Sequence, residues 1–452
     1  MLVLSVSVSV SVSVIPIEYK ILKMSVTHSK YTMTPIKSSE SDISIANIPI
    51  ISDNCRITDT RKLKDFKEQT FGGYNIAQAS NALDKAIIEE KIEPALHWSL
   101  QLFLSGIVNP LWSKLFSFAS KQINIYNPKL PEFLFNKNQQ WQHIIDNSKF
   151  TKDNVLLLRN HPTVRLLLAE MVTVLVLSKK RKINQLPKIK KEEFIIDIFK
   201  SKLEAKDNRL VETIITDEDP SEIRIAINEM AHHIHHKNTN KALYWMNWII
   251  EWEKINSKKY GKYECASRNI EGVDAKYNKD VVWLIWAAIY KIKSININMG
   301  FGSNNKPSNI WDKQIESLWK LYTNNFTPGA RGKKQNYLIW SILYITEPVD
   351  YAISLVDRPQ LLFQSILGFD KIIGTLKSQQ VVHTVNSDLL NVVVENNYMK
   401  PERHKDMTES LRRREYEKEL KQKEHLAKQK KINVESLDKL TEIQKLDKYL
   451  FA

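Results

Sequence analysis

The sequence is poor in glycine and cysteine, and each shortage excludes classes of protein. Only 11 of its 452 residues are glycine, so a turn-rich β architecture or a glycine-rich nucleotide loop would be hard to build. The two cysteines, Cys55 and Cys265, cannot form a disulfide framework and fit a reducing compartment. We therefore expect a protein that is not secreted and that works in the cytoplasm or nucleus.

Catalytic signatures and membrane spans are also missing. The sequence contains no GxxxxGK[ST] loop, no dinucleotide fingerprint, no nucleophile elbow, no CxxC pair and no HExxH motif. Its most apolar run, 166–177, is too short to cross a bilayer and contains Glu170. We expect no cofactor and no membrane partner, and we favour a protein that is not an enzyme.

The apolar pattern is helical. Apolar residues make up 43% of the chain and include 11 tryptophans, and they recur at helical spacing over most of the sequence. Helices are predicted at 81–91, 95–105, 110–119, 162–178, 192–204, 221–236, 241–256, 279–293, 309–323, 334–346 and 359–377. The Trp stripes at 245, 248 and 252 and at 283 and 286 are typical of core packing. We predict a mainly α fold, an irregular multi-helical array of helical hairpins.

Composition divides the chain into three parts. Residues 1–70 begin with alternating Ser and Val and show no helical period, which predicts a low-complexity, disordered arm. Residues 71–400 form the multi-helical body, with a sub-division near 179–191. Within it, Val392–Val394 predict a short strand or the buried end of the body. Residues 401–452 predict charged and amphipathic C-terminal helices.

A short echo links two parts of the body. Residues 94–100 read PALHWSL and residues 241–247 read KALYWMN, each after an Ala- and Ile-containing helix and a polar break. Ala allows close approach of two helices, and Trp fills the groove between them. The echo predicts one helical hairpin used twice.

The net charge of +15 favours an anionic partner such as nucleic acid, and two basic clusters could meet it. The first cluster follows an apolar helix. The second cluster lies in a stretch that contains Gly329 and Gly332, before another apolar helix. Such cations can neutralise phosphates, and a helix N-terminus can assist. The alternatives are a solvated linker and an ordinary exposed loop. The candidate residues are Lys179, Lys180, Arg181, Lys182, Lys188, Lys190 and Lys191, then Arg331, Lys333 and Lys334.

One cluster has metal-ligand spacing. Glu229, His232 and His236 lie three and four residues apart, so a helix would place them on one face, where carboxylate and imidazole can chelate a divalent metal. The alternative is a solvated helix end, where imidazolium is stabilised by the negative end of the helix dipole.

Two resemblances rest on specific stretches. Three stretches carry the first resemblance: Leu96-His97-Trp98 through 127–131, the helix with 242–245, and 326–329 through 346–349. Over about 75–400 the chain resembles an uncharacterised protein family of nucleocytoplasmic large DNA viruses of algae and protists. That resemblance implies a viral origin and transfers no activity. More locally, 95–106, 109–111 and 118–120 are similar to the helical oligomerisation region of clamp-loader-related ATPases. The ATPase motifs are missing, so the likeness implies at most a helical assembly module.

These expectations combine into one leading hypothesis. The chain would be a non-enzymatic helical accessory or scaffold protein, of viral origin, that acts beside nucleic acid in replication or transcription. It would bind protein partners through the helical body or the C-terminal helix, in the viral factory of the host cytoplasm or in the nucleus. The alternatives are a virion-associated structural protein and a metal-dependent enzyme that uses the 229–236 cluster.

Overall fold

The computed structural model describes residues 53–148, 150–151, 154–182, 186–261, 263–298 and 308–394. Within these ranges the chain is helical, and the only β pairing is an isolated bridge between Gln69 and Asn75. The predicted mainly α, multi-helical fold is therefore confirmed. No helix in the described ranges combines the length and apolarity that crossing a membrane requires.

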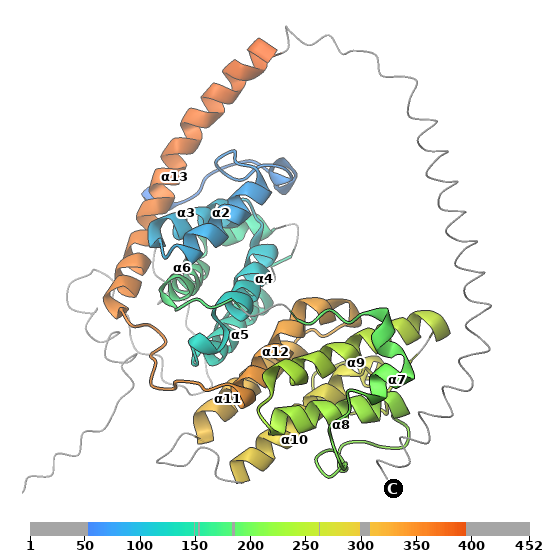
Figure 1. The fold of residues 1–452 in the computed structure, drawn as a ribbon. Helices are drawn as coiled ribbons and strands as arrows, with labels where there is room; N and C mark the ends of the chain where they lie inside the picture. The colour runs from blue at the N-terminus through green and yellow to red at the C-terminus, as the bar shows by residue number, and fades with distance from the viewer. Residues whose placement is uncertain are drawn as a thin grey trace, which may run out of the picture.

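The helices gather into two bundles (Figure 1). The first holds α2 (Ile76–Ile88), α3 (Ile92–Leu104), α4 (Val108–Phe118), α5 (Leu130–Ser148), α6 (Pro162–Leu177) and α13 (Pro359–Val394). The second holds α7 (Ile196–Lys200), α8 (Ser221–His235), α9 (Thr239–Tyr260), α10 (Val282–Asn298), α11 (Ser308–Thr323) and α12 (Arg331–Thr346). The last helix, α13, returns to the first bundle and packs on α3 and α6. The sub-division predicted near 179–191 falls where the chain passes from one bundle to the other.

The two bundles share one core. Helix α5 packs along α11, and there the Glu132 amide donates to Gln314 Oε1 at 3.1 Å while Gln314 Nε2 donates to Glu132 Oε2 at 3.2 Å. The Tyr344 hydroxyl of α12 donates to the Pro128 carbonyl at 2.8 Å. Buried apolar side chains form one cluster across both bundles, so the described ranges pack as one body.

The repeated hairpin is present in both bundles. Helices α2 and α3 form one copy and α8 and α9 the other, and the turns have matching geometry. Glu90 and Lys237 both have φ of 56°. In each turn, the amide of the next residue donates to the carbonyl five residues earlier. The Lys91 amide bonds the Ala86 carbonyl at 3.0 Å, and the Asn238 amide bonds the His233 carbonyl at 2.8 Å. This is the closing bond of a helix C-terminal motif with one left-handed residue.

The tryptophan stripes pack the core, as predicted. Trp245, Trp248, Trp283, Trp286 and Trp340 are all almost completely buried. In α9, Trp248 stacks on Trp252 with ring centroids 5.2 Å apart. Aromatic rings of this size bury large apolar areas, so they stabilise helix pairs that contain few glycines.

Several predicted boundaries were wrong. Helix α5 was not predicted, because Asn127-Pro128 and Leu130-Pro131 suggested a break, although Pro131 fits a helix's first turn. The helix predicted at 192–204 is shorter, with a 3₁₀ turn at Lys191–Phe194 followed by α7. Val392–Val394 are the end of α13 and form no strand.

The predicted N-terminal arm ends earlier than residue 70. Ile57, Phe66 and Phe71 are buried. The Ile57 amide donates to Asn160 Oδ1, and Asn160 Nδ2 donates back to the Ile57 carbonyl, both at 2.8 Å. Residues from 53 onward therefore belong to the body. The rest of the predicted arm, 1–52, and the predicted C-terminal helices, 401–452, lie outside the described residues.

Candidate nucleic-acid interface

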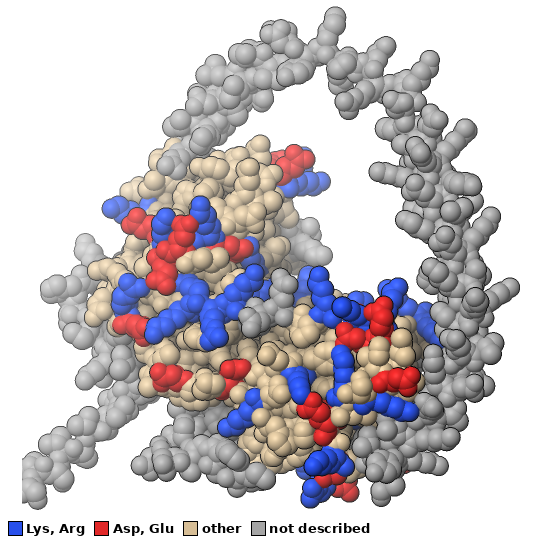
Figure 2. Space-filling view, viewed as in Figure 1, with Lys and Arg blue, Asp and Glu red and all other residues tan. Residues whose placement is uncertain are grey.

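Residues 179–191, called the basic linker below, run from the end of α6 to the turn before α7. The linker carries Lys179, Lys180, Arg181, Lys182, Lys188, Lys190 and Lys191, and no acidic residue. Figure 2 shows Lys and Arg side chains gathered where the two bundles meet on the face in view, with acidic side chains above them on the first bundle and in smaller patches beside and below them. The linker thus adds seven cations and no carboxylate at the junction.

The backbone of the linker is anchored at Arg181. Its amide donates to the Gln122 carbonyl at 2.7 Å, and its carbonyl accepts from Asn124 Nδ2 at 2.7 Å. Gln122 lies in a π-helical turn, Ala119–Ile123, that ends α4, and Asn124 is buried with φ of 44° and ψ of −131°, which is outside the left-handed helical region. The irregular end of α4 therefore fixes the start of the linker.

The linker's cations differ in how much of their charge the protein itself uses. The Lys180 ammonium bonds the Val176 carbonyl at the end of α6 and lies 3.5 Å from Glu90 Oε1. Burial lowers its pKa, and Glu90 opposes that change. The Arg181 guanidinium lies 4.9 Å above the Tyr126 ring, where it remains exposed. The other five lysines of the linker are also exposed: Lys179, Lys182, Lys188, Lys190 and Lys191.

Arg331, in the second predicted cluster, is committed to an internal ion triad. It is the first residue of α12 and lies in no loop. Its Nη2 lies 2.6 Å from Glu253 Oε2 and its Nη1 2.9 Å from Asp280 Oδ1. Burial alone would lower the pKa of Arg331, but Asp280 and Glu253 together raise it above its ordinary value. The prediction of Arg331 as a phosphate contact is corrected, because both faces of its guanidinium fork already meet carboxylates.

Lys334 is also turned inward. Its ammonium donates to the carbonyls of Tyr322 at 2.8 Å and Leu321 at 3.3 Å, and also to that of Asn324. These carbonyls end α11 and have no partner within that helix. Burial lowers the pKa of Lys334 to about 8. Lys334 is therefore a helix cap, and only Lys333 of this cluster is exposed.

The metal prediction is not supported by the geometry. Glu229 is buried, and its carboxylate accepts the amides of Glu204 and Ala205 at 2.9–3.0 Å. It lies 3.6 Å from His233 Nε2, whereas the rings of His232 and His236 lie against each other, tilted by 37° with centroids 4.2 Å apart. No group of three potential ligands among the described residues could hold a metal ion.

The alternative, a solvated helix end, fits His236, which is exposed with its Nδ1 2.8 Å from the His232 carbonyl, but it does not fit the buried His233. Burial lowers the pKa of His232 and lowers that of His233 to about 4. His233 is therefore neutral at physiological pH, and no imidazolium there stabilises the helix end. It packs inside the α8–α9 hairpin instead.

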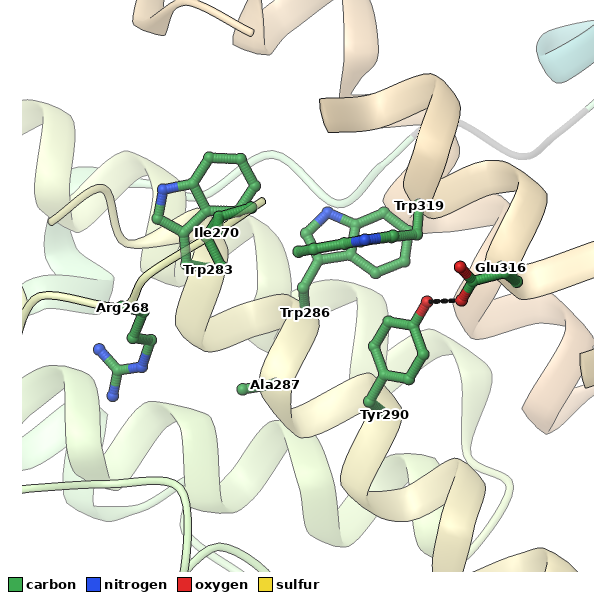
Figure 3. A pocket seen from close by; sticks show the side chains of 8 residues that line it. All are labelled: Arg268, Ile270, Trp283, Trp286, Ala287, Tyr290, Glu316 and Trp319. Carbon is green, nitrogen blue, oxygen red and sulfur yellow. Dashed lines mark hydrogen bonds between the residues drawn. The ribbon is translucent and has the colours of Figure 1, made fainter. Parts of the chain in front are cut away.

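A second feature was not predicted from the sequence. An open aromatic pocket with a volume of about 380 Å³ lies between α10, α11 and the loop before α10. Figure 3 shows Trp283, Trp286 and Trp319 along one side, and Ala287 in the space between Arg268 and Tyr290. Its lining is completed by Ile270 and Glu316. The Trp stripe at 283 and 286 pointed to this region, but nothing in the sequence showed that Trp319 and Tyr290 stay partly exposed.

Comparison with known proteins adds no further information on this site. Neither the protein-family models, nor the curated proteins, nor the solved structures gave a match to this chain.

Proposed function

We propose that the protein is a non-enzymatic helical accessory or scaffold protein that holds nucleic acid by its phosphates along the basic linker. The supporting observation is the linker itself, an acid-free stretch with six exposed cations at the junction of two bundles. The packed helical body would hold protein partners. A viral setting, in replication or transcription, is part of this proposal and comes from the resemblance alone.

Phosphate binding suits these residues physically. Lys and Arg that neutralise phosphates release condensed counterions, which provides most of the sequence-independent affinity. Arg181 is stacked on Tyr126 and anchored through its backbone. Less conformational entropy is therefore lost when that side chain is fixed on a ligand. Because the proposed contacts are with phosphates and not with base edges, we expect weak sequence preference.

The salt dependence of binding tests the proposal quantitatively. If the six cations other than Lys180 each neutralise one phosphate, log K should fall against log salt with a slope of about −5 on duplex DNA and about −4 on a single strand. Fully extended, the 13-residue linker reaches roughly 40 Å. Fluorescence anisotropy with 20-base-pair and 20-nucleotide probes, from 50 to 300 mM salt, gives both slopes.

A charge-matched pair of variants locates the effect. Changing Lys182, Lys188, Lys190 and Lys191 to Glu should abolish most of the binding and flatten the slope. The control changes four exposed lysines elsewhere to Glu, at 64, 67, 258 and 259, and it alters the net charge equally. Urea unfolding should show changes within about 0.5 kcal/mol per substitution in both variants, because surface substitutions cost little. Equal loss in both variants, or no binding by the wild type at 50 mM salt, would refute the proposal.

A further inference from the structure

The aromatic pocket of the second bundle has walls made mostly of ring surfaces. Trp319 stands nearly perpendicular to Trp286, with centroids 5.3 Å apart, and to Tyr290, with centroids 5.8 Å apart. Trp286 is almost fully buried, while Trp319 and Tyr290 are only partly covered. Indole and phenol rings carry negative potential on their faces, which attracts cations. The pocket therefore favours a positively charged group over an anion.

The charged groups at the pocket reinforce this preference. Glu316 Oε2 accepts the Tyr290 hydroxyl at 2.9 Å, which orients the carboxylate at one end of the pocket (Figure 3). Arg268, at the other end, is neutralised by the buried Asp219, with Nη2 2.8 Å from Asp219 Oδ2. The Lys320 ammonium lies 3.5 Å from Glu316 Oε1, and both side chains are nearly half exposed, so this solvent-screened pair is weak and a bound cation can take the place of Lys320. Glu316 is thus the acidic group that the pocket offers to a cation.

The neighbouring turn already shows this chemistry within the protein. The Lys293 ammonium lies 4.5 Å from the centre of the Tyr290 ring and pairs with Asp312. Asp312 precedes Glu316 by one turn of α11, so the two carboxylates follow each other along the seam with α10. Asp312 is paired with Lys293, whose ammonium lies on the Tyr290 ring, whereas the pocket beside Glu316 is open.

We propose that this pocket binds an arginine side chain of a partner protein. A planar guanidinium can lie on an indole face and donate two N–H groups to one carboxylate, which an ammonium cannot do. Each carboxylate oxygen accepts more than one hydrogen bond, so Glu316 can keep the Tyr290 hydroxyl while it binds the guanidinium. Interface affinity also concentrates where a side chain such as Arg fills a pocket whose floor is buried. This site is distinct from the basic linker and does not depend on it.

The test compares a charged probe with its neutral isostere. The full chain, labelled with 5-fluorotryptophan, is titrated with Nα-acetyl-arginine amide, Nα-acetyl-citrulline amide and Nα-acetyl-lysine amide while ¹⁹F spectra are recorded. The Trp319 signal, assigned with Trp319→Phe, should shift with arginine, and the citrulline and lysine probes should bind about tenfold more weakly. The signals of Trp112 and Trp141, in the first bundle, should stay fixed.

Two variants and one matched control separate a site from a structural effect. Glu316→Gln keeps the shape but removes the charge and should weaken arginine binding about tenfold. Ala287→Leu should block the space between Arg268 and Tyr290 and also reduce binding, although the carboxylate is untouched. Glu251→Gln is the control, because Glu251 pairs with the exposed Lys254 on α9 as Glu316 pairs with Lys320. This variant should bind arginine as tightly as the wild type does. Equal binding of arginine and citrulline, unchanged binding by Glu316→Gln, or stronger binding of lysine than of arginine would overturn the proposal.

Discussion

The basic linker and residues 331–334 carry the same kinds of side chain, yet their environments differ. In the linker, Lys179, Lys182 and the lysines that follow are exposed. In the second stretch, Arg331 binds Glu253 and Asp280, and Lys334 caps α11. A cation at a helix N-terminus is disfavoured by the helix dipole, so Arg331 at the start of α12 requires close carboxylates. The comparison separates cations that are available to a ligand from cations that maintain the fold.

The largest effect is expected at Arg331. Arg331→Ala leaves Glu253 and Asp280 largely buried without a counter-ion, which should lower the free energy of unfolding by about 3–5 kcal/mol. The exposed neighbour Lys333→Ala should change it by less than about 0.5 kcal/mol. Urea denaturation measures both values.

A rescue experiment sharpens this prediction. Adding Glu253→Gln and Asp280→Asn to an Arg331→Met background removes the unpaired charges and should recover part of the lost stability. If Arg331→Ala were as stable as Lys333→Ala, the ion triad would not hold the fold, and the contrast between the two stretches would fail.

A smaller, pH-dependent effect is expected at Lys334. Its folded pKa of about 8 lies below the ordinary lysine value, so between those two values the unfolded chain binds more protons than the folded one. Stability from this group should therefore rise as the pH increases above about 8, by up to about 3 kcal/mol in total. Between pH 7.5 and 10 the wild type should gain about 2.4 kcal/mol of this relative to Lys334→Met.

Unfolding curves collected at intervals across that range, for both proteins, give the difference directly. Other groups titrate in both proteins alike and cancel in the subtraction. Parallel curves would mean that the Lys334 amine keeps its proton across this range, because its hydrogen bonds to the α11 carbonyls offset the cost of burial.

The fold was predictable because its signals are local. Periodic apolar residues mark most helices within a few residues. The matching PALHW and KALYW segments pointed correctly to two hairpins, since the same short sequence follows the same turn in each. Helix α5 was missed because prolines mark both breaks and first turns, and only packing on α11 decides between them.

The site was less predictable because its contacts are distant in sequence. Arg331 meets carboxylates 78 and 51 residues away, which no local pattern indicates. Glu229 and His232 have metal-ligand spacing, but tertiary packing directs Glu229 to the amides of residues 204 and 205. The exposure of the linker was easier to predict, because a run of cations without acidic residues has few internal partners to find.

Lysine reactivity in the presence of nucleic acid tests the central claim most directly. The protein is acetylated with a water-soluble reagent, with and without a saturating 20-base-pair duplex at low salt, and each lysine is quantified by mass spectrometry. We expect Lys179, Lys182, Lys188, Lys190 and Lys191 to lose reactivity several-fold, while Lys64, Lys67, Lys258 and Lys259 keep it. Protection of that second group with unchanged linker reactivity would contradict the account, and so would uniform protection of all nine.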